Sequence, residues 1–295
     1  LTNAPNKTPR YKIQKEQRNR STSRTYFKRL ARGSESNTTM NIFHKGNSDL
    51  TNAIVRSDWE AVKVECEAHP KSATVWSTRV GFFDGEHESH VLPIHSAAAL
   101  CAPKDAIEAL ALANPDGVKA KETSFKRLPL HIACQSHAPE DVVSTLLSFY
   151  PQGAADTDVI GRLPLHYACS NGASVEVVEE LLAAHPWSAS GEDIHGWLPI
   201  HVACHFGAST CVIRALTNAN PDSIEARTEK GSTPMTLIKK INCKNKEEVL
   251  HVLEDAAWLH WHGPMRHHPV HSDRGHDLGL HHRIVRSGAH PQVHH

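Results

Sequence analysis

The stretch LPLHYACSNGASVEVVEELLAAHP, residues 163–186, recurs with small changes on both sides of itself. LPLHIACQSHAPEDVVSTLLSFYP begins 35 residues earlier, at Leu128, and LPIHVACHFGASTCVIRALTNANP begins 35 residues later, at Leu198. Three tandem copies indicate that one structural unit is used repeatedly. A period of about 20–50 residues is typical of solenoids and related repeat architectures.

Prolines and alanines keep the same period beyond these three copies. The proline of the L-P-[IL]-H phrase falls at Pro93, Pro129, Pro164 and Pro199, with Pro234 in the variant TPMT. A second proline follows 22 residues after each of the first four, at Pro115, Pro151, Pro186 and Pro221. An alanine lies nine residues after each of the first four prolines of the L-P-[IL]-H series, at Ala102, Ala138, Ala173 and Ala208. Three series in one register establish a repeat protein.

Each unit is predicted to be a pair of antiparallel helices. The first proline suits the first helical position, where its missing N–H is not needed. Leu165, Ala168 and Cys169 then give the apolar spacing of a short helix. The pattern V-V-x-x-L-L predicts a second helix that ends before Pro186. Gly161 supplies the tight turn that returns the chain. Such a pair cannot bury its apolar faces alone, so neighbouring units must stack.

The repeating pattern is a turn glycine, then [TL]-P-[LI]-H-x-A, then V-V-x-x-L-L. This order resembles the ankyrin repeat, and the resemblance covers roughly residues 49–257. The usual period of that family is about 33 residues. The resemblance implies an all-α solenoid of stacked helix pairs, with projecting finger-like turns that line a concave face. It also implies that the chain binds proteins and carries no chemistry of its own. We count about six helix pairs, the first without L-P-x-H and the last rich in lysine.

The units depart from the family at the start of the first helix. Leucine replaces the family's threonine at Leu92, Leu128, Leu163 and Leu198. The missing hydroxyl cap costs about 1 kcal/mol for each helix, and we expect leucine packing between units to compensate. The role of the following histidines is open. The last unit keeps Thr233 and has Thr236 in place of histidine.

Composition divides the chain into three parts. Residues 1–40 hold ten Lys/Arg against two acids and are predicted to be a disordered basic leader. Residues 41–257, the predicted ankyrin-repeat domain, hold 18 against 28. Residues 258–295 contain eleven of the 24 histidines and are predicted to be a disordered tail. An insertion of about ten residues between the first two units contains Asp84-Gly85, which predicts a hairpin turn.

Two columns of residues could suggest a metal or redox array, namely Cys134, Cys169, Cys204 and His131, His166, His201. Stacked helices lie about 8–10 Å apart, whereas a disulfide needs Cα atoms within about 7 Å and zinc needs donors at about 2.0–2.3 Å. We therefore predict buried thiols and core histidines bonded to backbone carbonyls. The tail histidines could chelate metal adventitiously.

Catalytic motifs are not apparent. The sequence His87-Glu88-Ser89-His90 is one residue short of the H-E-x-x-H zinc motif. No glycine-rich phosphate loop and no G-x-S-x-G sequence occurs. The prediction is a non-enzyme that needs no cofactor and no metal and takes no small-molecule substrate.

The basic leader leaves alternatives open. It could contact nucleic acid or anionic lipid, or act as an organelle presequence, or be a solvated disordered leader, translated or not. An odd number of cysteines, seven, without a preceding secretory signal predicts reduced thiols and an intracellular location. The cytoplasm is favoured, with nucleus and organelle as alternatives.

The predicted function is non-catalytic protein–protein recognition by a monomeric scaffold or adaptor. One alternative is an accessory fragment of a larger enzyme or channel whose active part precedes residue 1. Another is an organelle- or nucleic-acid-directed protein that acts through its leader.

The resemblance also implies where a partner binds, on exposed positions before the first-helix proline and at the end of the first helix. Carried onto this chain, these positions are Phe125, Arg127, Gln135, Ser136, Ile160, Arg162, Ser170, Asn171, His195, Trp197, His205 and Phe206. Aromatic residues and arginine dominate binding hot spots. The alternative for Trp197 is that it packs over the neighbouring turn and shields the backbone.

Overall fold

The structure is a computed structural model, and it describes residues 49–80 and 88–262. These ranges contain twelve α-helices in six consecutive pairs, with one two-stranded sheet. The first helices of the pairs are α2 (Asp49–Val55), α4 (Pro93–Ala99), α6 (Pro129–Gln135), α8 (Pro164–Asn171), α10 (Pro199–Phe206) and α12 (Pro234–Lys240). The second helices are α3 (Trp59–Ala68), α5 (Lys104–Ala113), α7 (Glu140–Phe149), α9 (Val175–Ala184), α11 (Thr210–Ala219) and α13 (Lys246–His262).

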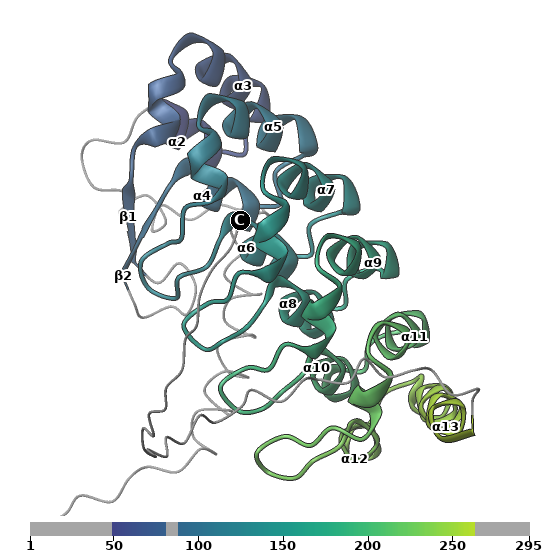
Figure 1. Cartoon of the computed structure of the whole chain (residues 1–295). Coiled ribbons are helices and arrows are strands. Elements are labelled where there is room, and N and C mark those ends of the chain that lie inside the picture. The colour runs from purple at the N-terminus through teal and green to yellow at the C-terminus, as the bar shows by residue number, and fades with distance from the viewer. Residues whose placement is uncertain (1–48, 81–87, 263–295) are drawn as a thin grey trace, which may run out of the picture. The chain divides into compact units, whose positions relative to one another are not determined.

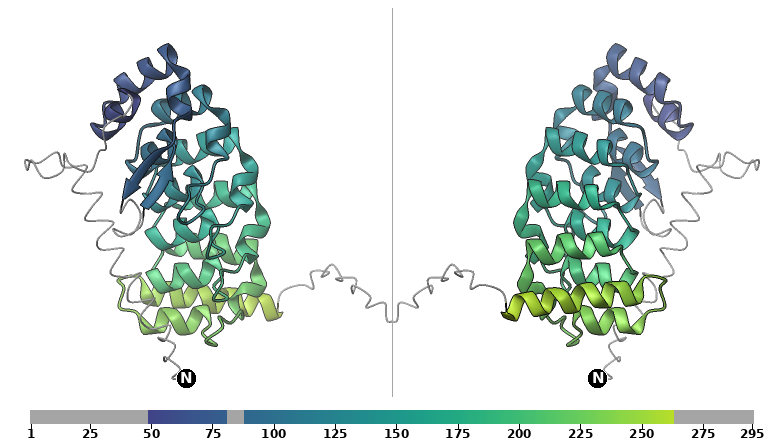
Figure 2. Two further views of the ribbon diagram at one scale, coloured as in Figure 1. Left: turned by 90° about the vertical axis from the view of Figure 1, so that its left-hand side faces the viewer. Right: turned by 90° about the vertical axis from the view of Figure 1, so that its right-hand side faces the viewer.

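The pairs stack in sequence order. Each first helix contacts the first helix of the next pair, from α2 through to α12, and each second helix contacts the next second helix, from α3 through to α13. Figures 1 and 2 show the two resulting rows of helices. The all-α solenoid of stacked helix pairs is therefore confirmed.

The two proline series mark both ends of each unit. The prolines of the first series are the first residues of their helices, each preceded by an extended cap residue such as Leu163 (φ −82°, ψ 161°). The second helices end two residues before the second prolines, which begin short 3-10 turns. These turns are η2 (Pro70–Thr74), η3 (Pro115–Val118), η4 (Pro151–Ala155), η5 (Pro186–Ser190) and η6 (Pro221–Ile224). Proline thus stops one helix by constraining the residue before it and starts the next turn.

A two-stranded antiparallel sheet lies in the insertion before α4. Strands β1 (Ser77–Val80) and β2 (Glu88–Val91) pair antiparallel, with Ser77 opposite Val91 and Val80 opposite Glu88. The predicted turn at Asp84-Gly85 lies outside the described residues. The described part of the H-E-S-H sequence, residues 88–90, lies on a strand and not on the helix that a zinc motif requires.

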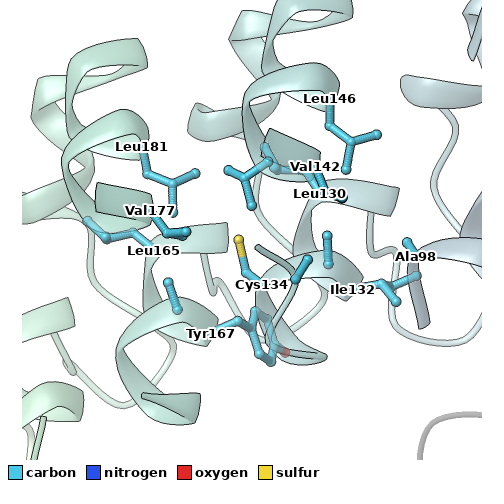
Figure 3. Close-up of a cluster of buried hydrophobic side chains, with 14 of the residues drawn as sticks. Ala98, Leu130, Ile132, Cys134, Val142, Leu146, Leu165, Tyr167, Val177 and Leu181 are labelled. Atoms are coloured by element: carbon cyan, nitrogen blue, oxygen red, sulfur yellow. The ribbon is translucent and has the colours of Figure 1, made fainter. Parts of the chain in front are cut away.

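The core is continuous from one helix pair to the next. Figure 3 shows buried side chains of α6 and α7 in contact with those of α8 and α9, among them Leu130, Leu146, Leu165 and Leu181. The cap leucines are buried as well, with Leu128 fully enclosed. A buried leucine contributes about 1.5–3 kcal/mol, which is more than the hydroxyl cap it replaces. The expected packing by leucine is thus observed.

The described ends of the chain differ from the predicted boundaries. α13 continues to His262, so residues 258–262, which we assigned to the tail, are helical. The helix ends immediately before Gly263-Pro264, a pair of residues that breaks helices. The leader 1–40 and the remaining tail, 263–295, lie outside the described residues. Within the described ranges, no helix is both long enough and apolar enough to cross a bilayer.

Candidate protein-binding surface

Four loops connect the 3-10 turns to the following first helices, and we call them fingers: residues 119–128, 156–163, 191–198 and 225–233. Single backbone hydrogen bonds join one finger to the next. The N–H of Val159 donates to the carbonyl of Phe125 at 2.9 Å, and that of Ile194 donates to the carbonyl of Ile160 at 3.0 Å. These bonds hold the tips of consecutive fingers side by side.

A buried carboxylate shapes each of the first three fingers from within. The Oδ1 atom of Asp193 accepts hydrogen bonds from the N–H groups of His195 (2.9 Å) and Trp197 (3.1 Å). Asp158 and Glu122 bind the N–H groups of their own fingers in the same way. These acids were not among the predicted functional residues. Their signal was an acidic residue six or seven residues before the repeating proline.

Arg127 and Arg162 were expected to be exposed, and the structure corrects this. Arg127 is only 8% exposed, and its guanidinium lies between the rings of Phe125 (4.5 Å) and Tyr167 (4.9 Å). The Nε atom of Arg162 donates to Oδ2 of Asp193 at 3.1 Å, with 14% of its side chain exposed. Both arginines reach the next repeat. There the guanidinium of Arg127 packs on the ring of Tyr167, and that of Arg162 bonds to the carboxylate of Asp193. These contacts between repeats stabilise the stack and leave the arginines less available to a partner.

The histidines that follow the first prolines link repeats in the same direction. In His166, Nδ1 accepts from the N–H of Leu163 (3.1 Å) and Nε2 donates to the carbonyl of Trp197 in the next finger (2.9 Å). His95, His131 and His201 make the corresponding pairs of bonds. The predicted core histidines bonded to backbone carbonyls are confirmed. Burial lowers the pKa of His95, His131 and His166 to about 4, so they are neutral at pH 7.

The cysteine column is enclosed in the core. Cys134, Cys169 and Cys204 are buried free thiols. Burial raises the pKa of Cys134 and Cys204 to about 12 and raises that of Cys169 as well. A protonated thiol is neither a nucleophile nor a metal ligand. In the part of the chain that the structure describes, no group of three His, Cys, Asp or Glu residues is arranged to hold a metal ion.

Two predicted aromatic residues do reach the surface. The rings of Trp197 and His205 lie 5.3 Å apart, and those of His205 and Phe206 lie 4.7 Å apart. Trp197 is half-buried and packs against the core, whereas Phe206 is 38% exposed. Val159 and Ile194, at equivalent positions of two fingers, are 49% and 51% exposed. We missed these two, and we call Val159, Ile194, Trp197 and Phe206 the finger patch.

The other predicted positions are partly exposed and lie on the fingers or at the ends of first helices: Phe125, Gln135, Ser136, Ile160, Ser170, Asn171, His195 and His205. Several of them make contacts within the fold. Gln135 accepts from Arg127 at 3.0 Å, and Asn171 donates to the carbonyl of Tyr167 at 2.9 Å. Their role in binding stays a prediction.

The comparisons with known proteins point to one family. The family profile described as ankyrin repeats, in three copies, matches residues 94–190. This match extends from α4 to the end of η5 and so covers three of the described helix pairs. Among curated proteins, none matches the chain.

Proposed function

The chain is an ankyrin-repeat protein, and from this premise we propose that it is a non-catalytic adaptor that binds another protein across its fingers and the adjoining ends of its first helices. Ankyrin repeats are in general modules of protein–protein interaction. The observation that carries the proposal is the finger patch, with its exposed Val159, Ile194 and Phe206. The proposed adaptor acts as a monomer.

The finger patch has the composition and the rigidity of a binding site. Large apolar side chains on a loop give a folded chain little stability while they remain in water. The backbone beneath them is held by Asp158 and Asp193 and by the bonds between fingers. A surface that is already ordered loses less conformational entropy when it binds. Aromatic residues such as Trp197 and Phe206 also provide most of the energy at many interfaces.

The environment of the reactive side chains supports a non-catalytic role. The described histidines with strongly lowered pKa values are buried and bonded at both ring nitrogens. Asp158 and Asp193 are occupied by backbone N–H groups. All seven cysteines are free thiols, which agrees with the intracellular location that we propose.

Site-specific crosslinking tests the surface. A photo-reactive residue is placed at Ile194 in the finger patch and, as a matched control, at the exposed Glu179 on α9 in the other row of helices. We expect the partner to be captured from Ile194 and not from Glu179. With the captured partner purified, the double variant Trp197→Ala/Phe206→Ala should bind it about 2–4 kcal/mol more weakly.

Stability measurements separate binding from folding. The exposed substitutions Ile194→Ala and Phe206→Ala should leave the melting temperature nearly unchanged, and Trp187→Ala is a control because Trp187 is 73% exposed outside the patch. If Phe206→Ala and Ile194→Ala both bind the partner normally, the proposed surface is wrong. If Trp197→Ala alone lowers the melting temperature by many degrees, Trp197 is needed for packing. The binding test then uses Ile194→Ala and Phe206→Ala.

A further inference from the structure

The last helix differs from every other second helix in the described chain. α13 has 17 residues, whereas α3, α5, α7, α9 and α11 have ten each. Its buried residues, Val249, Val252 and Leu253, lie in its first half, and the helix contacts α11 and α12. The second half contains no buried residue, although His260 within it lies 3.7 Å from Asp222 of η6.

This second half carries large apolar side chains in water. Trp258, Leu259 and Trp261 are 61%, 60% and 68% exposed. Two exposed tryptophans on one helical turn are not explained by folding, because neither is enclosed by the neighbouring repeat. Such residues are typical of a surface that is covered by a partner.

Two carboxylates share a face of the helix with the tryptophans. Glu247, Glu254, Trp258 and Trp261 are all exposed. Counted from Glu247, the other three lie seven, eleven and fourteen residues further on. These spacings are close to two, three and four helical turns of about 3.6 residues, so the four side chains lie on one face. They form one stripe, acidic at one end and aromatic at the other, that points away from the buried face. We call it the α13 stripe.

The ring of Trp258 already accepts a flat nitrogen-containing group. The imidazole of His262 stacks on it with centroids 5.2 Å apart and an angle of 22° between the planes. Nδ1 of His262 lies 3.1 Å from the carbonyl oxygen of Trp258. A guanidinium group has a similar planar shape, carries a permanent positive charge and stacks on indole rings.

We propose that the α13 stripe is a docking site for an arginine-bearing segment of a partner protein, separate from the finger patch. The carboxylates of Glu247 and Glu254 supply the opposite charge and can accept paired hydrogen bonds from guanidinium groups. Trp258 and Trp261 supply the ring faces on which the same or adjacent arginines stack. A lysine-bearing segment fits less well, because a compact ammonium neither stacks nor binds in a fork.

Peptide binding to the full chain tests this proposal. A nona-arginine peptide and a nona-lysine peptide are titrated by calorimetry at about 0.15 M salt, which screens diffuse attraction to the acidic surface. We expect the arginine peptide to bind more tightly. The variant Trp258→Ala/Trp261→Ala should weaken its binding about five- to tenfold, and Trp258→Phe/Trp261→Phe should retain most of it. Glu254→Gln should weaken it by a smaller factor.

Matched variants complete the design. Leu259→Ala, on the same helix but off the stripe, and Glu179→Gln, an exposed acid on α9, should leave the affinity unchanged. Unaltered helical circular dichroism confirms that each variant is folded. The proposal is overturned if the double alanine variant binds as the unaltered chain does, or if both peptides bind equally. It is also overturned if the unaltered chain dimerises in sedimentation experiments and the double variant does not, since the stripe then binds a second copy.

Discussion

The interior repeats and the last repeat begin their first helices in different ways. In the interior repeats, a buried histidine such as His166 caps its own helix and donates to the finger of the following repeat. In the last repeat, the exposed Thr236 takes that position. Its hydroxyl accepts from the N–H of Thr233 at 2.8 Å and bonds within its own turn. No further finger follows α12 and α13 in the described part of the chain.

The difference shows that these side chains are matched to the next repeat. A histidine is useful where another finger offers a carbonyl, and a threonine is enough where none follows. Two of the residues that precede cap leucines show the same dependence on the next repeat. Arg162 precedes a finger that holds Asp193, whereas Trp197 precedes a finger that holds the neutral Thr228 at the equivalent position. The polar residues of one unit thus depend on its neighbour.

Acid should have the largest effect, and it should act on the interior repeats. The pKa of His95, His131 and His166 is about 4 in the folded chain and about 6.5 when unfolded. Their contribution is complete above pH 6.5 and is lost as the pH falls toward 4, because the unfolded chain binds protons first. We expect urea unfolding to show a loss of roughly 6 kcal/mol between pH 7 and pH 5, about 2 for each histidine.

A variant tests whether the histidines are responsible for this loss. His166→Gln removes one buried titrating group, so its stability should fall by about 2 kcal/mol less between pH 7 and pH 5. An identical pH profile for the variant would contradict the assignment.

Loss of a finger carboxylate should come next. Asp193→Ala leaves the N–H groups of His195 and Trp197 without their acceptor and the partly buried Arg162 without its counter-ion. We expect a loss of about 3–5 kcal/mol in the free energy of unfolding. Thr228→Ala removes one bond, to the N–H of Ser232, and should cost about 1 kcal/mol. If Asp193→Ala and Thr228→Ala lower the free energy of unfolding equally, the interior and last repeats do not differ in their dependence on this finger residue.

Exchanging the residues His166 and Thr236 should lower stability by an intermediate amount, and only in the direction from histidine to threonine. His166→Thr removes the bond to the next finger and leaves a cavity in the core, so we expect a loss of about 2–4 kcal/mol. The reverse change, Thr236→His, places an imidazole at an exposed position and should alter stability by less than about 0.5 kcal/mol. Chemical denaturation measures both. A large loss in Thr236→His would show that the position, and not the following repeat, sets the requirement.

The smallest effect concerns the backbone of one finger. Lys126 has φ 57° where the other fingers have Gly161, Gly196 and Gly231. Lys126→Gly should therefore stabilise the chain by about 0.5–1 kcal/mol, since glycine adopts this conformation without steric strain. Gly161→Ala should destabilise it, because the added Cβ would lie 3.3 Å from the Cα of Asp193. Thermal unfolding of both variants decides the matter, and an unchanged or lowered melting temperature for Lys126→Gly would contradict the assignment of strain.

The repeat and the positions of its helices could be predicted from the amino-acid pattern alone. Proline acts on the residues beside it, and apolar spacing reflects the geometry of a single helix, so the starts at Pro129 and Pro164 could be read directly. The exposed Phe206 could also be predicted, from its place at the end of α10. The extension of α13 to His262 had a local signal as well, the following Gly263-Pro264, which the histidine-rich composition obscured.

Which polar residues stay exposed and which hold the stack follows from the packing of the repeats. Arg162 and Asp193 are 31 residues apart in the chain, as are His166 and the carbonyl of Trp197. No local pattern pairs them, because they meet only when one repeat packs on the next. Stacking buries Arg127 and engages Arg162 with Asp193, although both were expected on the surface, and it leaves Val159, Ile194 and Trp258 exposed. Exposure of a side chain depends on its neighbours in space, and a repeating sequence specifies those neighbours only through the fold.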